Sequence, residues 1–299
     1  TLSSSSAASD VYKRQTPVLS VRDSYDAANQ AYTLEVSQSC PATPGQSEKQ
    51  PFLIPLALGL LGEAGNLPLR LAGEEPDPET GDNTHKVLMV DAPSQTFVFE
   101  GVAEQPVPSL LRGFSAPVRL DYQYTREGLC QLMSRDDDGF VRWDSAQSLA
   151  LQVIEQVQEQ LAESQPVKVD RLLTDACQQL LADESLDPAM VAEMLTLPSE
   201  NYLAELAGEG AADVELIHRA RQAVQKAIGI AVKDQFLARY HSLASDAAYA
   251  PSGEQIAARA LRNCCLVYLA AGGPEHLPLA ASQLQSCLLY TSPSPRDGL

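Results

Sequence analysis

The sequence predicts a multidomain chain in which an antiparallel, Ig-like β-sandwich is followed by an α-helical, solenoid-like domain. Short alternating segments, punctuated by Pro, Gly, Asn and Asp, extend from Thr16 to about Tyr124, as in antiparallel sandwiches. Beyond Glu127 the apolar spacing changes from two to 3.6 residues. The 299 residues also suffice for two ordinary domains. We therefore expect a β-sandwich at 16–138 and a helical domain at 139–286.

The expected strands follow from alternation, because side chains on a strand repeat every two residues. Tyr32, Leu34 and Val36 alternate with polar residues, Phe97 and Phe99 share one face, and 116–124 alternates in the same way. The polar stretch 73–85 has dense turn formers and is expected to be a long exposed loop. Further strands are expected near 17–22, 51–60, 67–71 and 86–90, which makes about seven.

The expected helices follow from apolar stripes and capping residues. Leu149, Val153 and Val157 belong to one stripe after a break at 135–140. Asp187 before Pro188 is typical of a helix start, and Ser252 with Gln255 fits a capping box. Such consecutive short helices favour stacked helical pairs, although no clean repeat is visible. The predicted helices are 127–134, 143–161, 172–181, 188–194, 200–206, 213–228, 230–242, 253–271 and 277–284.

Both ends of the chain are predicted to be foreign to the fold. Residues 5–15 resemble the translation of a transposase sequencing adapter, and 287–297 resemble the opposite strand of that adapter. We therefore expect 1–15 and 287–299 to be adapter-derived, disordered tails, and the helical domain to be truncated at 286.

Composition excludes some partners. The formal charge is −18, from 39 acidic and 21 basic residues, which repels nucleic-acid phosphates and anionic lipid. No apolar run approaches the ~18 residues of a membrane span; 52–61 is too short and contains Pro55. Cys40, Cys130, Cys177, Cys264 and Cys265 lack regular spacing, which is typical of reduced thiols in a cytoplasmic protein. We expect no nucleic-acid or membrane partner and a cytoplasmic location.

No catalytic or metal-binding residue is predicted in this chain. His85, His218, His241 and His276 have no histidine four residues on and no following glutamate, so local spacing gives no zinc site and solvated or capping histidines are expected. The adjacent Cys264 and Cys265, with no CxxC anywhere, favour packing over metal binding.

Three other weak signals are also interpreted structurally. Gly208 and Gly210 lack the third glycine of a dinucleotide-binding loop. Asp136–Asp138 lacks the alternating oxygen ligands of a calcium loop and is expected to be a solvated turn. Cys287 falls within the adapter-like end.

Several stretches resemble the C-terminal half of the bacterial aminopeptidase N family, the gluzincin-type zinc alanyl aminopeptidases. They are QPVPSLLRGFSAPVRLDY (105–122), RWDSAQSL (142–149), LTLPSENYLAEL (195–206) and RALRNCCLVYLA (259–270), and 42–61 resembles the family's middle β domain. The resemblance implies an enzyme that removes N-terminal amino acids from peptides, with zinc bound through HExxH and a later glutamate, and with a GxMEN loop and a tyrosine that act on the substrate.

Neither HExxH nor GxMEN occurs in these residues, so the resemblance implies a non-catalytic middle and C-terminal portion that binds no zinc itself. Peptides would be substrates of the full-length parent only. Tyr122 and Tyr124 are expected to be core aromatics rather than the catalytic tyrosine. The alternative is a free-standing protein-binding module, a β-sandwich joined to an α-solenoid without enzymatic activity, which architecture alone does not exclude.

Overall fold

The computed structural model describes residues 16–42, 49–74, 83–207, 212–245 and 247–285. The chain divides into two compact units, Thr1–Arg142 and Trp143–Leu299. The predicted adapter tails, 1–15 and 287–299, lie outside the described residues, as do Gly208, Gly210 and Cys287. The predicted domain boundary after Asp138 stays a prediction.

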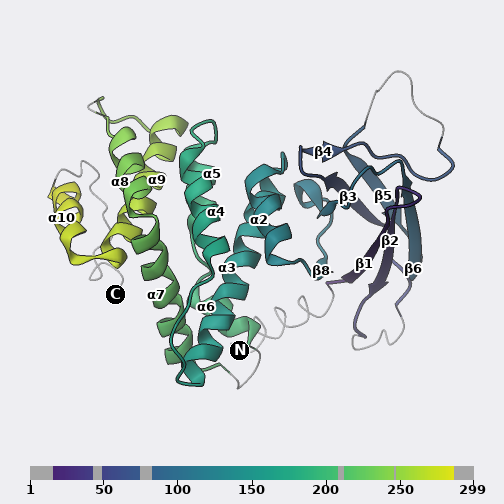
Figure 1. The fold of residues 1–299 in the computed structure, drawn as a ribbon, viewed down its shortest axis with the longest axis horizontal. Helices are drawn as coiled ribbons and strands as arrows, with labels where there is room; N and C mark the ends of the chain where they lie inside the picture. Colours follow the sequence, from purple (N-terminus) through teal and green to yellow (C-terminus); the bar gives the residue numbers. More distant parts are fainter. Residues whose placement is uncertain (1–15, 43–48, 75–82, 208–211, 246, 286–299) are drawn as a thin grey trace, which may run out of the picture. The chain divides into compact units, whose positions relative to one another are not determined.

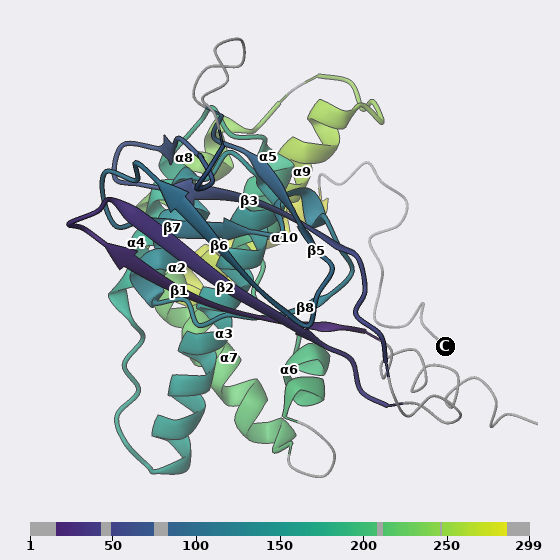
Figure 2. The ribbon, with the colours of Figure 1, turned by 90° about the vertical axis from the view of Figure 1, so that its right-hand side faces the viewer.

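Within the residues described, the first unit contains two sheets (Figure 1). The first sheet has the strand order β6-β2-β1-β8, and the second has the order β4-β3-β5 with β7 also paired to β3. Figure 2 shows β1 and β2 as long, twisted neighbours. The strands are β1 (Val18–Asp26), β2 (Ala31–Ser39), β3 (Ile54–Leu61), β4 (Asn66–Leu67), β5 (Lys86–Val90), β6 (Ser94–Glu100), β7 (Val107–Leu110) and β8 (Arg119–Asp121).

The core of the first unit lies between these sheets. Tyr32, Leu34 and Val36 are fully buried on β2, and their neighbours Glu35 and Ser37 are exposed, which confirms the alternation. One face of β2 therefore faces the core and the other faces solvent. Both sheets contribute to this core through Leu19, Val21, Tyr32, Leu34, Val36, Phe99, Leu56, Leu58, Leu60, Leu88 and Val90.

The sheets differ from the prediction at their short strands. The expected antiparallel strand at 116–124 is only β8, Arg119–Asp121, and it pairs with β1 in parallel. The expected strand at 67–71 is reduced to β4, whose two residues pair with the end of β3. Strand β7 was not predicted, because Pro106 and Pro108 argue against a strand. Its carbonyl and amide groups nevertheless pair with β3.

The first unit ends with helical residues. Helix α2 (Arg126–Arg135) is capped by Thr125 and packs on β7. Leu132 on α2 and Val141, in the first turn of α3 (Gly139–Ala162), form a small cluster with Leu61. Asp136–Asp138 separates the two helices, so the predicted break is present in the backbone.

The second unit is entirely helical within the residues described. The predicted capping residues act as expected: Asp187 accepts from the backbone N–H groups of Ala189 and Met190, and Ser252 accepts from Gln255. The helices that follow α3 are α4 (Arg171–Ala182), α5 (Pro188–Leu195), α6 (Glu200–Leu206), α7 (Val214–Ala231), α8 (Lys233–Ser242), α9 (Gly253–Gly272), the 3₁₀ turn η2 (Pro274–His276) and α10 (Leu277–Gln285).

Helix α9 is the centre of the second unit and contacts α5, α7 and α8, which lie beside it (Figure 1). Its crossing with α7 requires glycine, because a Cβ on Gly229 would lie 2.2 Å from the carbonyl oxygen of Tyr268. The ring of Tyr268 stacks on Phe236, with centroids 4.8 Å apart, and its hydroxyl donates to the carbonyl of Leu195. Three neighbouring helices are thus fixed to α9 by one buried tyrosine.

Candidate functional site

A buried arginine lies where four segments of the first unit meet. Arg112 is 5% exposed; its Nε donates to Ser109 Oγ at 2.7 Å, and its Nη2 donates to Asn66 Oδ1 at 2.7 Å and to Asp136 Oδ1 at 3.2 Å. Asp137 lies 3.9 Å from the same Nη2. We call Asn66, Ser109, Arg112, Asp136 and Asp137 the Arg112 centre.

Burial of the Asp136 carboxyl group costs free energy. Burial raises the pKa of Asp136, while Ser109, the backbone N–H of Asp138 and the Arg112 guanidinium act in the opposite direction. Its Oδ2 is buried without a hydrogen-bond partner among the described residues. The Arg112 guanidinium lies beside this carboxyl group and opposes the effect of burial, so the pair fixes the loop to the sheet.

The expectation of a solvated turn at Asp136–Asp138 is wrong for Asp136, which is 1% exposed. Asp138 also has structural contacts: its carboxylate accepts from the backbone N–H of Val141, at the start of α3, and from that of Gly113. The loop therefore joins α3 to the turn that carries Arg112.

The backbone at this turn is unusual. Leu111 has φ 57° and Gly113 has φ 59°, on either side of Arg112. Leucine seldom adopts the left-handed region, so the contacts of the Arg112 centre must hold it there. Ser109, Arg112 and Asp136 are buried and hydrogen-bonded to one another, so the centre acts as a structural anchor.

The four histidines do not come together. His85 is exposed in the first unit, His241 is exposed at the end of α8, and His218 Nδ1 lies 2.8 Å from Glu200 Oε1. His276 was expected to be solvated or capping, but it is only 9% exposed and its Nε2 has no hydrogen-bond partner within the described ranges. The nearest acid, Glu275, lies 3.7 Å away.

The cysteines behave as packed side chains. Cys177 and Cys265 are buried, and Cys40, Cys130 and Cys264 are half-buried; all five are free thiols. Burial raises the pKa of Cys265 to about 12 and also raises that of Cys264. Thiolates, the reactive and metal-binding form, are therefore disfavoured at both positions.

Tyr122 and Tyr124 lie against the interior of the first unit. Tyr122 packs on the sandwich core and donates its hydroxyl to Asp23 at 2.9 Å, while Tyr124 donates to the carbonyl of Pro108 at 2.8 Å. Burial and the neighbouring Asp23 raise the pKa of Tyr122. Each hydroxyl is used in a fixed structural contact.

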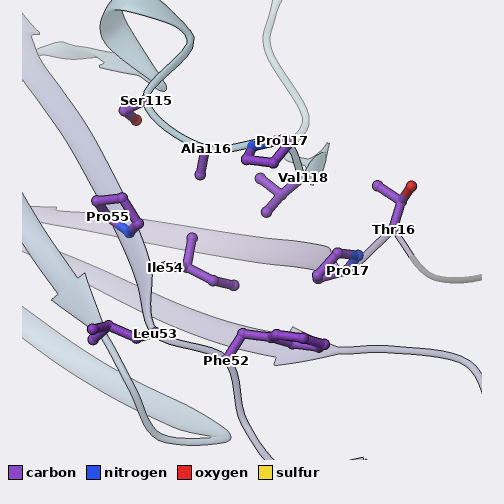
Figure 3. A pocket seen from close by; sticks show the side chains of 10 residues that line it. All are labelled: Thr16, Pro17, Phe52, Leu53, Ile54, Pro55, Ser115, Ala116, Pro117 and Val118. Atoms are coloured by element: carbon purple, nitrogen blue, oxygen red, sulfur yellow. The ribbon is translucent and has the colours of Figure 1, made fainter.

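Two cavities among the described residues are further candidates. The first, of about 400 Å³, lies in the first unit and is lined by apolar side chains from three segments (Figure 3). Ile54 lies below Ala116 and to the left of Pro17 in this view, and Phe52 is 41% exposed at the edge. Ser115 also lines the cavity, and its hydroxyl oxygen accepts a hydrogen bond from the backbone N–H of Ala57. An apolar hollow of this kind provides contact area but no chemistry.

The second cavity, of about 290 Å³, lies in the second unit and combines polar and aromatic groups. It lies between the beginning of α3 and the beginning of α6. Gln147 on α3 donates to the carbonyl of Thr196 at 2.8 Å, and Arg221 donates to that of Pro198, so both walls are fixed. We call it the Asp144 pocket; its lining is Trp143, Asp144, Gln147, Ser148, Leu151, Pro198, Ser199 and Tyr202.

Neither a metal cluster nor a membrane span is found in the part of the chain that the structure describes. No group of three or more His, Cys, Asp or Glu side chains there is arranged to hold a metal ion. None of the described helices is both long and apolar enough to cross a membrane.

The comparisons with known families agree with this architecture. Residues 126–291 match the family described as "Domain of unknown function (DUF3458_C) ARM repeats", and residues 15–123 match "Domain of unknown function (DUF3458) Ig-like fold". The chain is an Ig-like sandwich followed by a helical repeat domain, which confirms the predicted fold class. Because the first match covers more than half of the residues, the chain belongs to the DUF3458_C family.

Two sequence relatives and one solved structure are similar to this chain. The chain is 40% identical to Aminopeptidase N of Escherichia coli K12 and 35% identical to that of Haemophilus influenzae, over 86% and 85% of its length. It is similar in structure to Legionella pneumophila aminopeptidase A in complex with aspartic acid, with a TM-score of 0.71, 26% identity and 90% of the chain covered. The predicted resemblance to the aminopeptidase N family is confirmed.

The match covers only part of these relatives. The chain spans 28% of the length of the two Aminopeptidase N sequences and 29% of the Legionella chain. Its similarity is to the C-terminal part of aminopeptidase N.

Two features went unpredicted, the Arg112 centre and the Asp144 pocket. Arg112 is the one charged residue in the mainly apolar stretch 107–118, VPSLLRGFSAPV, and such a charge indicates a buried partner. Trp143 and Asp144 lie before the apolar stripe of α3. No local pattern in the sequence indicates that Tyr202, about 60 residues later, lines the same pocket.

Proposed function

We propose that this chain is the non-catalytic β-sandwich and helical portion of a zinc-dependent aminopeptidase, which removes N-terminal amino acids from peptides. The observation that carries the proposal is the 40% identity to Aminopeptidase N of E. coli over 258 residues. That similarity extends through both units in one order, with the Ig-like family match first and the helical match second. A β-sandwich or a helical repeat alone would support many functions, whereas their combination with this identity supports one.

Zinc belongs to the parent in this proposal. The histidines of the described residues lie apart, and both described cysteines of the adjacent pair have raised thiol pKa values, so this donor set does not fit a zinc ion. The residues 16–286 would shape and support the enzyme rather than act on the peptide bond.

The same proposal includes location and partners. An acidic chain with unpatterned free cysteines suits the cytoplasm. Peptides would be substrates of the whole enzyme, and the charge of −18 argues against nucleic acid and anionic membrane surfaces as partners.

A chimera tests the proposal. The region of E. coli Aminopeptidase N that matches this chain is replaced by the corresponding residues of this chain, and release of arylamine from an alanyl arylamide is measured with and without a chelator. We expect chelator-sensitive turnover, because both units would support the catalytic part as the relative's own residues do. A control chimera carries Leu261→Pro, which breaks the central helix α9.

The contrary result is a folded chimera, judged by circular dichroism, without turnover. The 299-residue chain alone, purified free of host aminopeptidase, should release no arylamine, since it contains no HExxH motif. Chelator-sensitive turnover by the chain itself would place an active site within it.

A further inference from the structure

The Asp144 pocket contains an acidic side chain without a partner. Asp144 is the single charged residue among those that line it, and no described residue forms a hydrogen bond or an ion pair with its carboxylate. The carboxylate is accessible to solvent at the pocket surface, and the protein on its other sides raises the pKa of Asp144 by desolvation. A cation bound beside it would favour the charged form.

Two aromatic rings complete the pocket. Trp143 is 37% exposed and Tyr202 is 48% exposed, and both line the cavity. Aromatic faces attract ammonium and guanidinium groups. This chain stacks guanidinium groups on tyrosine elsewhere, with Arg262 4.6 Å from the ring centroid of Tyr240.

The volume favours a small group. About 290 Å³ is at the lower end of the range of ligand pockets and suits one amino-acid side chain rather than a drug-sized molecule. An anion would meet the Asp144 carboxylate, and an apolar group would leave that carboxylate desolvated without compensation.

We propose that the Asp144 pocket binds an alkylguanidinium or alkylammonium group, with Asp144 as its counter-ion and with Trp143 and Tyr202 as its aromatic walls. The group is carried by a free basic amino acid or by a basic side chain of a peptide. This site is independent of the proposed aminopeptidase activity, because it lies wholly in the second unit and needs no zinc.

The chain supplies its own probe for this test. Trp143 is its single tryptophan, so intrinsic tryptophan fluorescence of the 299-residue chain reports on the pocket alone. The probes are arginine amide and citrulline amide, which have nearly the same shape but differ in the charge of the terminal group. We expect a saturable change with arginine amide at a dissociation constant of about 1 mM. Citrulline amide should bind at least about tenfold more weakly.

Variants then assign the binding to named residues. Asp144→Asn should weaken arginine amide about tenfold or more, because a charge-assisted contact is lost. Glu155→Gln is the matched control: Glu155 lies on the same helix, its carboxyl pKa is also raised by burial, and it does not line the pocket. Tyr202→Leu should weaken binding about threefold, while Tyr202→Phe keeps the ring and the affinity. Circular dichroism confirms that each variant is folded.

The ligand source is resolved with the tripeptide Ala-Arg-Ala. Equal or tighter binding of the tripeptide assigns the pocket to peptides, and its failure to bind assigns the pocket to the free amino acid. Equal binding of citrulline amide and arginine amide would overturn the proposal, as would equal affinity of Asp144→Asn and the wild type. The absence of any saturable change with arginine amide would overturn it as well.

Discussion

Replacement of Arg112 by methionine should destabilise the first unit more than any surface substitution. The change keeps an unbranched side chain but removes the donors to Ser109, Asn66 and Asp136. It leaves a carboxylate that is 1% exposed and whose Oδ2 already lacks a partner among the described residues. Loss of one member of a buried pair typically costs about 3–5 kcal/mol, and we expect that cost at about pH 7.

The cost should depend on pH in a defined direction. The pKa of Asp136 is raised in the folded state, so its contribution to stability is greatest below the unfolded pKa and is lost as the pH rises through the folded pKa. Arg112 opposes this rise, so Arg112→Met moves the folded pKa of Asp136 still higher. The loss caused by Arg112→Met should therefore be smaller at about pH 5 than at about pH 7.

Hydrogen–deuterium exchange measures this effect in each unit separately. Peptides from β3 and α2 should exchange faster in Arg112→Met, while peptides from α9 should not change. Arg22→Met is the control, because the ion pair of Arg22 with Asp121, at 3.8 Å, is exposed, and its loss should cost less than about 1 kcal/mol.

A double variant isolates the pair. Asp136→Asn keeps an oxygen acceptor for the backbone N–H of Asp138 but removes the charge. Arg112→Met with Asp136→Asn should therefore be less destabilised than the sum of the two single variants. A loss below about 1 kcal/mol in Arg112→Met, a loss independent of pH, or strict additivity would refute the view that charge compensation holds this centre.

Two further predictions concern the second unit. Gly229→Ala should lower the thermal midpoint, because the new Cβ would lie 2.2 Å from the backbone of Tyr268 and the overpacking cost of about 1–3 kcal/mol exceeds the ~1 kcal/mol gain in helix propensity. Gly253→Ala is the control and should not lower the midpoint, because a Cβ at Gly253 would have no atom within 4 Å. Equal midpoints for the two variants would contradict the close crossing of α7 and α9. Cys265 is buried and its thiol pKa is raised to about 12, so it should react with iodoacetamide only after the chain is unfolded. Mass spectrometry maps the labelled cysteines. Labelling of Cys265 in the native chain would contradict its burial.

The helices could be predicted because their signals are local. Asp187 before Pro188 and Ser252 before Gln255 place helix starts within a few residues, and the predicted ranges 188–194 and 253–271 differ from α5 and α9 by one residue at the C-terminal end. The apolar stripes then fix the face that each helix buries. No partner far away in sequence is needed for either signal.

The short strands and the Arg112 centre depend on distant partners instead. Strand β7 pairs with β3 about 50 residues earlier, and β8 pairs in parallel with β1, about 100 residues earlier. Asp136 looks like one of three solvated aspartates until the fold brings Arg112 to it. Residue type shows a charge, but only the tertiary structure shows whether that charge is buried with a counter-ion.

The same distinction governs the Asp144 pocket, since a chain of charge −18 attracts cations over its whole surface. A preference for arginine amide over citrulline amide could arise from that diffuse attraction alone. Asp144→Asn and Glu155→Gln each remove one negative charge, so the diffuse attraction falls equally in both variants. At about 0.15 M salt, charges more than ~8 Å apart are largely screened, whereas a contact pair beside two rings is screened much less. A difference in affinity between these two variants that persists at this ionic strength therefore measures the pocket and not the net charge.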